Sequence, residues 1–427
     1  MTRIGEELYA HVGALYPIFR SITGPGLRQT LDYIGRQIPL RVQEIPSGTQ
    51  VLDWVVPPEW SVRSATIETR DGRTVVDFAE HGLHLVHYSQ PIDRLVPLDE
   101  LQEHLHSLPD QPTLIPYRTS YYKESWGFCL AHEVRTRLRD PAYRVRIDTT
   151  LAPGSLSLGE AFLPGDEAGE VLISAHICHP QLANDNLSGI AVAIALAQKL
   201  TARRRRFGYR FLFMPGTIGA VAWLHQNRDA RARIHHGLVL TCLGDPGPPT
   251  YKRSRQGASL IDRCAAHVLS DEGFADRILP FTPWGYDERQ YCSPGFDLPV
   301  GCLMRSPSGA FPEYHTSADD LSLVTPAALA DSLSRLDRIL SMAEDDHRPV
   351  NAMPYGEPQL GPRGLYFSPT DDPQPFATET LLWVLNLSDA RHSLLDIAER
   401  AGRPFEEVAA AARVLSAKGL LRRAEVR

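Results

Sequence analysis

The stretch from Glu170 to Leu200 constrains the fold of this chain more than any other part of the sequence. Val171 to Ser174 is a short apolar run typical of a buried strand. Polar residues that do not belong in a hydrophobic core follow it, namely His176, His179, Asn184, Asp185 and Asn186. From Ile190 to Leu200 the chain is apolar nearly all round, which predicts a buried helix. In α/β proteins, polar residues between such a strand and helix lie at the carboxyl edge of a parallel sheet, where ligands bind. We therefore expect half of a metal site here.

Strand and helix patterns alternate through the same half of the chain. Further buried strands are expected at Tyr209 to Met214, Gly237 to Leu243 and Pro299 to Met304, and a helix is expected from Thr217 to His225. This alternation predicts an α/β fold, with a mostly parallel sheet that is covered by helices on both faces.

The N-terminal part of the chain has a different pattern. Residues 5–37 show helical spacing that is broken at Gly24-Pro25-Gly26. From about 48 to 92 the pattern is that of β-structure, and Asp71-Gly72 between two alternating runs predicts a hairpin. A helix is expected from Leu98 to Leu108.

These patterns predict three structural parts. Residues 1–47 and 116–350 should form the α/β domain, and residues 48–115 an inserted β-rich module. A stretch rich in Pro, Gly and Asp then predicts a linker. Three helical patterns and a short strand in residues 375–427 indicate a winged-helix-like domain.

The composition limits the class of protein and its partners. A chain of 427 residues, 43% hydrophobic and 22% charged, is typical of a globular protein with more than one domain. The net charge of −7 argues against a nucleic-acid surface. The N-terminus lacks the apolar core of a signal peptide, and no stretch approaches the ~20 apolar residues of a membrane span. We expect a cytoplasmic protein that binds neither nucleic acid nor membrane.

Several motifs resemble one known family. Ser174-Ala-His176, followed by Ala183-Asn-Asp-Asn-Leu-Ser-Gly189, resembles the signature of the zinc aminopeptidase superfamily. Three further segments resemble a bacterial family of aminopeptidase-like proteins with a small inserted domain and a C-terminal winged helix: Thr119–Cys129, Tyr286–Gly295 and Pro312–Asp320. The resemblance covers most of the chain and implies metal ligands at His176, Asp185 and His315.

The chain departs from the superfamily's pattern at three places. Cys178 stands where the superfamily has the Asp of His-x-Asp, and Thr241-Cys242 stands near a fourth ligand. The superfamily's pair of glutamates, a general base and a ligand, falls on Pro215-Gly216-Thr217. Too few ligands remain for two metals. We therefore expect one zinc ion on His176, Asp185 and His315, with a position left open for water.

Gly216 leaves the reaction without its usual proton acceptor, a contribution of typically 10²–10⁴-fold. Glu288 and Glu313 are candidate replacements, and Asp287 lies in the same loop as Glu288. Read instead as partners in surface salt bridges, these carboxylates would have no catalytic part, and the sequence leaves both interpretations open. The candidate substrate-binding residues are Asp287, Arg289, Arg305 and Tyr314.

Three functions remain to be compared. The first is a mono-zinc hydrolase of aminopeptidase type that cleaves an amide bond in a small peptide-like or biosynthetic substrate. The second is a metal-binding protein on a peptidase scaffold without peptidase activity, which Gly216 favours. The third is a DNA-binding regulator, but Glu406 and Glu407 would place negative charge against the phosphates. We expect the tail to serve packing or assembly of a homo-oligomer.

Overall fold

The computed structural model describes residues 3–366 and 376–423. The chain divides into two compact units. One comprises Met1–Ser259 and Leu279–Ser334, and the other comprises Leu260–Ile278 and Arg335–Arg427. The expected winged-helix range starts at 375 and ends at 427, so its first residue and its last four lie outside the described residues.

The main sheet carries the strands that the sequence pattern predicts. Within the described part of the chain it has eight strands, in the spatial order β1 (Arg41–Pro46), β10 (Ser155–Leu163), β12 (Gly208–Met214), β11 (Glu170–His176), β13 (Ile234–Leu240), β16 (Val300–Met304), β14 (Thr250–Lys252) and β15 (Ile278–Leu279). The central strands β12, β11, β13 and β16 are parallel, whereas β10 and β14 pair with them antiparallel. The expectation of a mostly parallel α/β sheet is confirmed.

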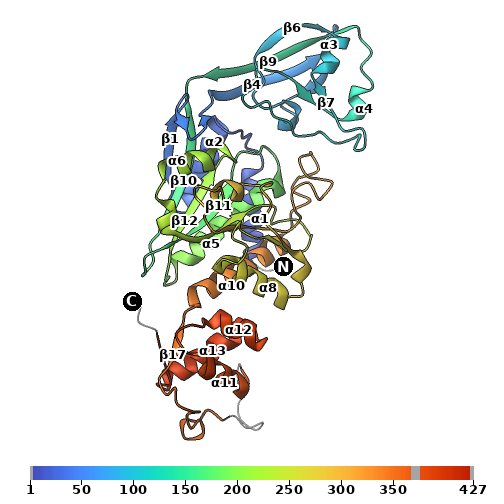
Figure 1. Cartoon of the computed structure of the whole chain (residues 1–427). Helices are drawn as coiled ribbons and strands as arrows, with labels where there is room; N and C mark the ends of the chain where they lie inside the picture. Colours follow the sequence, from blue (N-terminus) through green and yellow to red (C-terminus); the bar gives the residue numbers. More distant parts are fainter. Residues whose placement is uncertain (1–2, 367–375, 424–427) are drawn as a thin grey trace. The chain divides into compact units, whose positions relative to one another are not determined.

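The chain adds its next two parallel strands on opposite sides of β11. From β11 the chain passes through α5 (Gly189–Thr201) to β12 on one side, and from β12 through α6 (Ile218–Gln226) to β13 on the other side (Figure 1). Because such crossovers are right-handed, the two opposite directions place α5 and α6 on opposite faces of the sheet. Helix α5 contacts α1 (Arg3–Leu15) and α2 (Pro25–Gln37), and α6 contacts α9 (Glu288–Tyr291). The carboxyl end of β11 is thus the place where a doubly wound sheet binds its ligand.

Helix α5 is buried, as its apolar sequence predicts. Every residue from Gly189 to Ala197 is buried. A Cβ atom on Gly189 would lie 2.6 Å from the carbonyl oxygen of Leu240, the last residue of β13. Glycine therefore allows the first turn of α5 to pack directly against the end of a neighbouring strand.

A second, antiparallel sheet combines three strands of the expected β-rich module with one strand, β9 (Ala142–Ala152), that lies beyond it in the chain. Its strands, in spatial order, are β5 (Thr74–Asp77), β4 (Glu59–Glu68), β9 and β6 (Ile92–Pro97). The expected hairpin is present, because Thr66 pairs with Asp77 across a turn in which Gly72 has a φ of +86°. Arg28 of α2 binds both carboxylate oxygens of Glu59, at 2.7 and 2.5 Å, and so ties this sheet to the helical part of the chain.

The helix expected from Leu98 to Leu108 is shorter than its pattern predicted. Helix α3 (Leu98–Glu103) ends at His104, and β7 (Leu105–His106) then pairs with β8 (Phe128–Cys129). The last part of the apolar pattern therefore belongs to a strand. The small elements nearby are β2 (Gln50–Val51), β3 (Trp54–Val55), η1 (Gly82–His84) and α4 (His132–Arg135).

The second unit contains the three helices and the short strand expected in the tail. Its elements beyond residue 345 are β17 (Pro349–Asn351), η4 (Gly361–Arg363), α11 (Thr378–Leu387), α12 (Leu394–Ala401), α13 (Phe405–Ala417) and β18 (Leu421–Arg423), and β17 pairs with β18. It also includes α8 (Leu260–Asp271), η3 (Ala275–Arg277) and the end of α10 (Pro326–Asp345), while α7 (Ala230–Arg233) lies in the first unit.

Both acidic residues that open α13 have partners within this second unit. Arg338 donates to Glu406 at 3.0 Å, and the hydroxyl of Thr380 donates to Glu407 at 2.5 Å. Their carboxylates therefore help to hold the helices of the unit together. Over the residues that the structure describes, no helix combines the length and the apolar character that a membrane crossing requires.

Candidate functional site

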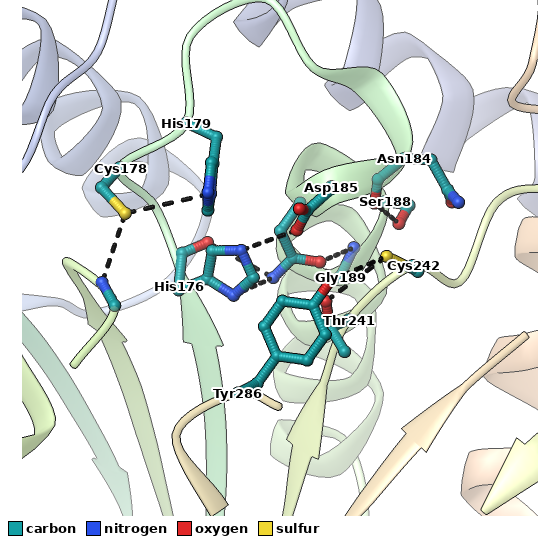
Figure 2. Close-up of polar contacts among 12 residues, drawn as sticks. His176, Cys178, His179, Asn184, Asp185, Ser188, Gly189, Thr241, Cys242 and Tyr286 are labelled. Atoms are coloured by element: carbon teal, nitrogen blue, oxygen red, sulfur yellow. Dashed lines mark hydrogen bonds and ion pairs between the residues drawn. The ribbon is translucent and has the colours of Figure 1, made fainter. Parts of the chain in front are cut away.

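Two residues of the central motif meet at the end of β11. His176 is the last residue of the strand, and its Nε2 donates to Oδ1 of Asp185 at 2.8 Å (Figure 2). Asp185 lies in the irregular turn η2 (Ala183–Ser188), directly before α5, and is completely buried. The strand end and the turn before the helix thus place an imidazole and a carboxylate face to face.

The neighbours of Asp185 fix the turn against the adjacent strand. Asn184 accepts from the backbone N–H of Gly244 at 2.9 Å, and Asn186 donates to the carbonyl of Leu240 at 3.0 Å. The hydroxyl of Ser188 accepts from the N–H of Leu243 at 2.9 Å. The polar residues of the motif therefore anchor Asp185 by binding backbone groups around the end of β13.

A distant segment brings the third expected ligand to the same carboxylate. Nε2 of His315 donates to Oδ2 of Asp185 at 3.0 Å. Four residues later, Asp319 accepts from the backbone N–H groups of Asn184 and Asp185, at 2.6 and 3.0 Å. One short segment thus supplies an imidazole and holds the turn that carries its partner. His176, Asp185 and His315, named from the sequence, lie together in the structure.

A third imidazole lies beside this group. Side-chain atoms of His176, His179 and Asp185 that are able to bind a metal all lie within 4.8 Å of one another. The ring of His179 is also 5.2 Å from the ring of His315. Its backbone carbonyl accepts from the buried guanidinium of Arg20 at 2.9 Å, which fixes this part of the loop.

The charge of the Asp185 carboxylate is strongly favoured. Burial alone would raise its pKa, but the charge of His179 and the hydrogen bonds from His176 and His315 hold that pKa well below the usual range. The pKa of His179 is lowered well below its ordinary value by burial, despite the opposing charge of Asp185. Histidine nitrogens and a carboxylate oxygen are among the donors that zinc binds.

Tyrosine rings pack against two of the imidazoles. The ring of Tyr286 stacks on His176 with centroids 5.0 Å apart, and its hydroxyl lies 3.3 Å from Sγ of Cys242. The ring of Tyr314 stacks on His315 with centroids 4.0 Å apart. These contacts restrict the rotation of both imidazoles.

A cavity of about 240 Å³ opens beside these residues. Its wall is rich in tyrosine and histidine, and the lining residues are Ile22, Tyr117, Thr119, Tyr121, His176, Cys178, His179, Gly216, Thr217, Gly285, Tyr286, Asp287, Tyr314 and His315. Its size suits a small substrate or one residue of a larger chain. Of the expected substrate-binding residues, Asp287 and Tyr314 belong to this wall.

Asp287 reaches the cavity from the loop before α9. Its Oδ1 accepts from the backbone N–H of Thr217 at 2.6 Å, and the residue is 4% exposed. Burial raises the pKa of Asp287 to about 6, although the charge of His176 and the bond from Thr217 lower it. Asp287 therefore binds the Gly216–Thr217 segment, on which the superfamily's pair of glutamates falls.

Glu288, one of the two expected bases, points elsewhere. Its side chain is completely buried, and its Oε1 forms an ion pair with the ammonium group of Lys252. Nζ of Lys252 also donates to the carbonyl of Trp284 at 2.7 Å. These contacts favour a structural role for Glu288, in which a buried ion pair holds the loop that carries Tyr286 and Asp287.

The other expected residues have different surroundings. Arg305 donates to Asp331 at 2.5 Å and to the carbonyl of Gly247 at 2.8 Å, which favours a structural role. Arg289 donates to the hydroxyl of Thr217 at 3.1 Å and so supports the wall from behind. Glu313 precedes the stacked pair of Tyr314 and His315, but its side chain is not among the cavity-lining residues described above.

Sequence reasoning missed the residues whose partners are distant in the chain. The pairing of Lys252 with Glu288 joins two separate segments of the chain and has no local signal in the sequence. Asp319 belongs to a quoted motif, but only the structure shows that it binds the turn around Asp185. The stacking of Tyr286 on His176 likewise depends on how two loops meet.

Models of two known families match most of the chain. A family model described as a domain of unknown function (DUF4910) matches residues 9–346, and a winged helix-turn-helix model matches residues 347–423. The chain is 44% identical, over 98% of its length and 96% of the relative's, to a Clostridium acetobutylicum protein named for polysaccharide biosynthesis and an aminopeptidase-like domain.

Solved structures show the same similarity in three dimensions. A crystal structure named as a peptidase from Clostridium acetobutylicum is 42% identical, with a TM-score of 0.93, and the alignment covers 98% of this chain and 96% of that one. A zinc aminopeptidase from Bacillus subtilis is 12% identical with a TM-score of 0.59, over 79% of this chain and 95% of that one, a likeness of fold alone.

Proposed function

The chain belongs to the DUF4910 family of aminopeptidase-like proteins, and from that premise we propose that it is a mono-zinc hydrolase. Its substrate is a small molecule, peptide-like or biosynthetic, in which it cleaves an amide bond. The observation that carries this proposal is the convergence of His176 and His315 on the two oxygens of Asp185.

The residues present fit one zinc ion. Two imidazole nitrogens and one carboxylate are a donor set that leaves a fourth position open. Asp185, which already faces both imidazoles, is buried and ionised, and His179 lies within reach of the same point. Zinc, when bound there, lowers the pKa of a water ligand to about 7 and polarises the carbonyl group of an amide.

The protein's own residues have separate tasks in this reaction. The rings of Tyr286 and Tyr314 hold the imidazoles of His176 and His315 in place. The aromatic wall of the cavity excludes water from the bound substrate and strengthens electrostatic contacts within it. The relative's name points to a substrate from polysaccharide biosynthesis, so N-acylated amino sugars are tested beside aminoacyl amides.

Metal content and substrate turnover test the proposal together. The full chain, loaded with zinc and freed of excess metal, should contain one zinc ion per chain and hydrolyse a member of a panel of aminoacyl amides and N-acylated amino sugars. His176→Ala and His315→Ala should each lose zinc and turnover. His392→Ala, which changes a partly exposed histidine bound to Asp389, is the matched control and should retain both.

Two outcomes would contradict the proposal in different ways. Zinc retained by both histidine variants would show that the metal site lies elsewhere. One zinc ion per chain without turnover on any amide would favour the alternative, a metal-binding protein on a peptidase fold that has lost its hydrolytic chemistry.

A further inference from the structure

Amide hydrolysis requires a group that accepts a proton from the attacking water and delivers it to the leaving nitrogen. We propose that this group is the carboxylate of Asp287, held at the cavity wall by the backbone N–H of Thr217. The inference rests on the proposed function and adds to it the catalytic base. It also moves that role from Glu288 and Glu313 to Asp287.

The position of Asp287 supports this role. Thr217 binds its Oδ1 at 2.6 Å, and the same cavity wall contains His176 and His315. Tyr286, the residue directly before Asp287, stacks on the ring of the expected ligand His176. Its buried setting keeps the pKa near that of a base that works around neutral pH.

The other nearby carboxylates are committed to different partners. Both oxygens of Asp185 accept from imidazoles. Glu288 is paired with the ammonium of Lys252 and is not among the residues that line the cavity. Glu313 does not contribute to the cavity wall. Among these carboxylates, Asp287 is therefore the one that lines the cavity.

The loop geometry explains how Asp287 is kept in position. Lys252 binds the carbonyl of Trp284 on one side of Asp287 and the carboxylate of Glu288 on the other. Tyr286 is fixed between them by its stacking on His176. Trp284, Tyr286, Asp287 and Glu288 thus all have defined contacts, and Asp287 is the carboxylate of this loop that lines the cavity.

The proton balance is complete with this one residue. As the water oxygen bonds to the carbonyl carbon, its O–H bond breaks and the proton passes to the carboxylate of Asp287. When the carbon–nitrogen bond breaks, the same proton passes to the leaving nitrogen. The products are a carboxylic acid and an amine, and Asp287 returns to its ionised state, so no further reactant is needed.

Gly216 offers an independent way to test the assignment. Its φ is not in the left-handed region, and a Cβ atom there would lie 3.7 Å from Sγ of Cys178 and 3.8 Å from Cβ of His176, both ordinary contacts. A side chain at this position would therefore fit and would start beside His176. Gly216→Glu is expected to introduce a second carboxylate beside the place that Asp287 occupies.

The experiment measures turnover, zinc content and thermal midpoint on the zinc-loaded full chain, with the substrate found in the panel above. Asp287→Asn should lower kcat by about 10²–10⁴-fold, with zinc content and midpoint unchanged. Glu313→Gln, the matched control, should retain kcat within about threefold. The double variant Gly216→Glu/Asp287→Asn should have a kcat at least about tenfold higher than that of Asp287→Asn alone.

Each result decides one point. A wild-type chain that holds zinc and turns over nothing refutes the proposed function, and the inference with it. Turnover retained by Asp287→Asn in an active wild-type background refutes the inference alone. Zinc lost on Asp287→Asn would make this residue a metal ligand and would equally refute its role as the base.

Discussion

Replacing Lys252 by methionine tests whether Glu288 belongs to the scaffold or to the catalytic machinery. The side chains of this ion pair are 8% and 0% exposed, so Lys252→Met leaves a buried carboxylate without a counter-charge. Removal of one partner from such a pair typically costs about 3–5 kcal/mol. For a unit of this size, the entropy of unfolding converts each kcal/mol of lost stability into a drop of about 1.5 °C in melting temperature. The melting temperature of Lys252→Met should therefore fall by about 5–8 °C.

A double variant and a surface control complete the design. Lys252→Met combined with Glu288→Met removes both charges and retains the packing volume, so most of the lost stability should return. Arg255 and Asp297 form an exposed pair, with 44% and 25% of their side chains accessible. Arg255→Met should cost less than about 1 kcal/mol. Melting of the full chain is followed by differential scanning calorimetry.

The reasoning fails under either of two results. One is a melting temperature for Lys252→Met that lies within about 1 °C of the Arg255→Met control, which is what an exposed pair would give. The other is a double variant no more stable than Lys252→Met, because the unpaired charge would then not be the cause of the loss.

Three further predictions concern the fold and the tail. Gly26→Ala should destabilise the chain by more than about 2 kcal/mol in urea unfolding. The reason is a clash in the core, because the new Cβ would lie 1.7 Å from the carbonyl oxygen of Phe19. Gly13→Ala, whose new Cβ would have nothing within 4 Å, is the control and should stabilise the chain by about 0.5–1 kcal/mol. Arg28 lowers the pKa of Glu59 in the folded protein. The pair therefore stabilises the fold at pH values above the pKa of Glu59 in the unfolded chain, and this effect is lost as the pH falls through the pKa of Glu59 in the folded protein. The difference in stability between wild type and Glu59→Gln, measured by urea titration, should accordingly shrink below about pH 4. The full chain should show no salt-sensitive binding to duplex DNA in fluorescence anisotropy, and binding that disappears on removing residues 375–427 would contradict this.

The sequence was sufficient for the order of the central elements, because apolar runs of strand length alternate with helical patterns there. It was less accurate where an apolar run continues beyond its strand. The strand expected at Gly237 to Leu243 ends at Leu240 as β13, because Cys242 has a φ of +48° and the N–H of Leu243 turns to the hydroxyl of Ser188. Both residues are apolar, so hydropathy gave no sign of the turn.

The candidate site shows the same division between local and long-range information. His176, Asp185 and His315 were named from motifs, and their side chains do meet. The choice between Asp287 and Glu288 was beyond the sequence, because adjacent residues at the start of a one-turn helix point in different directions. Only the fold shows that one meets Thr217 and the other meets Lys252.

The meeting of Asp185 and His315 also links ion binding to folding. The two residues are 130 positions apart in the chain, so an ion that bridges them closes a very long loop and finds its full set of donors only in the folded protein. By mass action, free metal at 100 times its dissociation constant adds about 2.7 kcal/mol to the free energy of unfolding. For the proposed zinc site, a chelator is therefore expected to act as a mild denaturant, with the melting temperature reporting how much metal is bound.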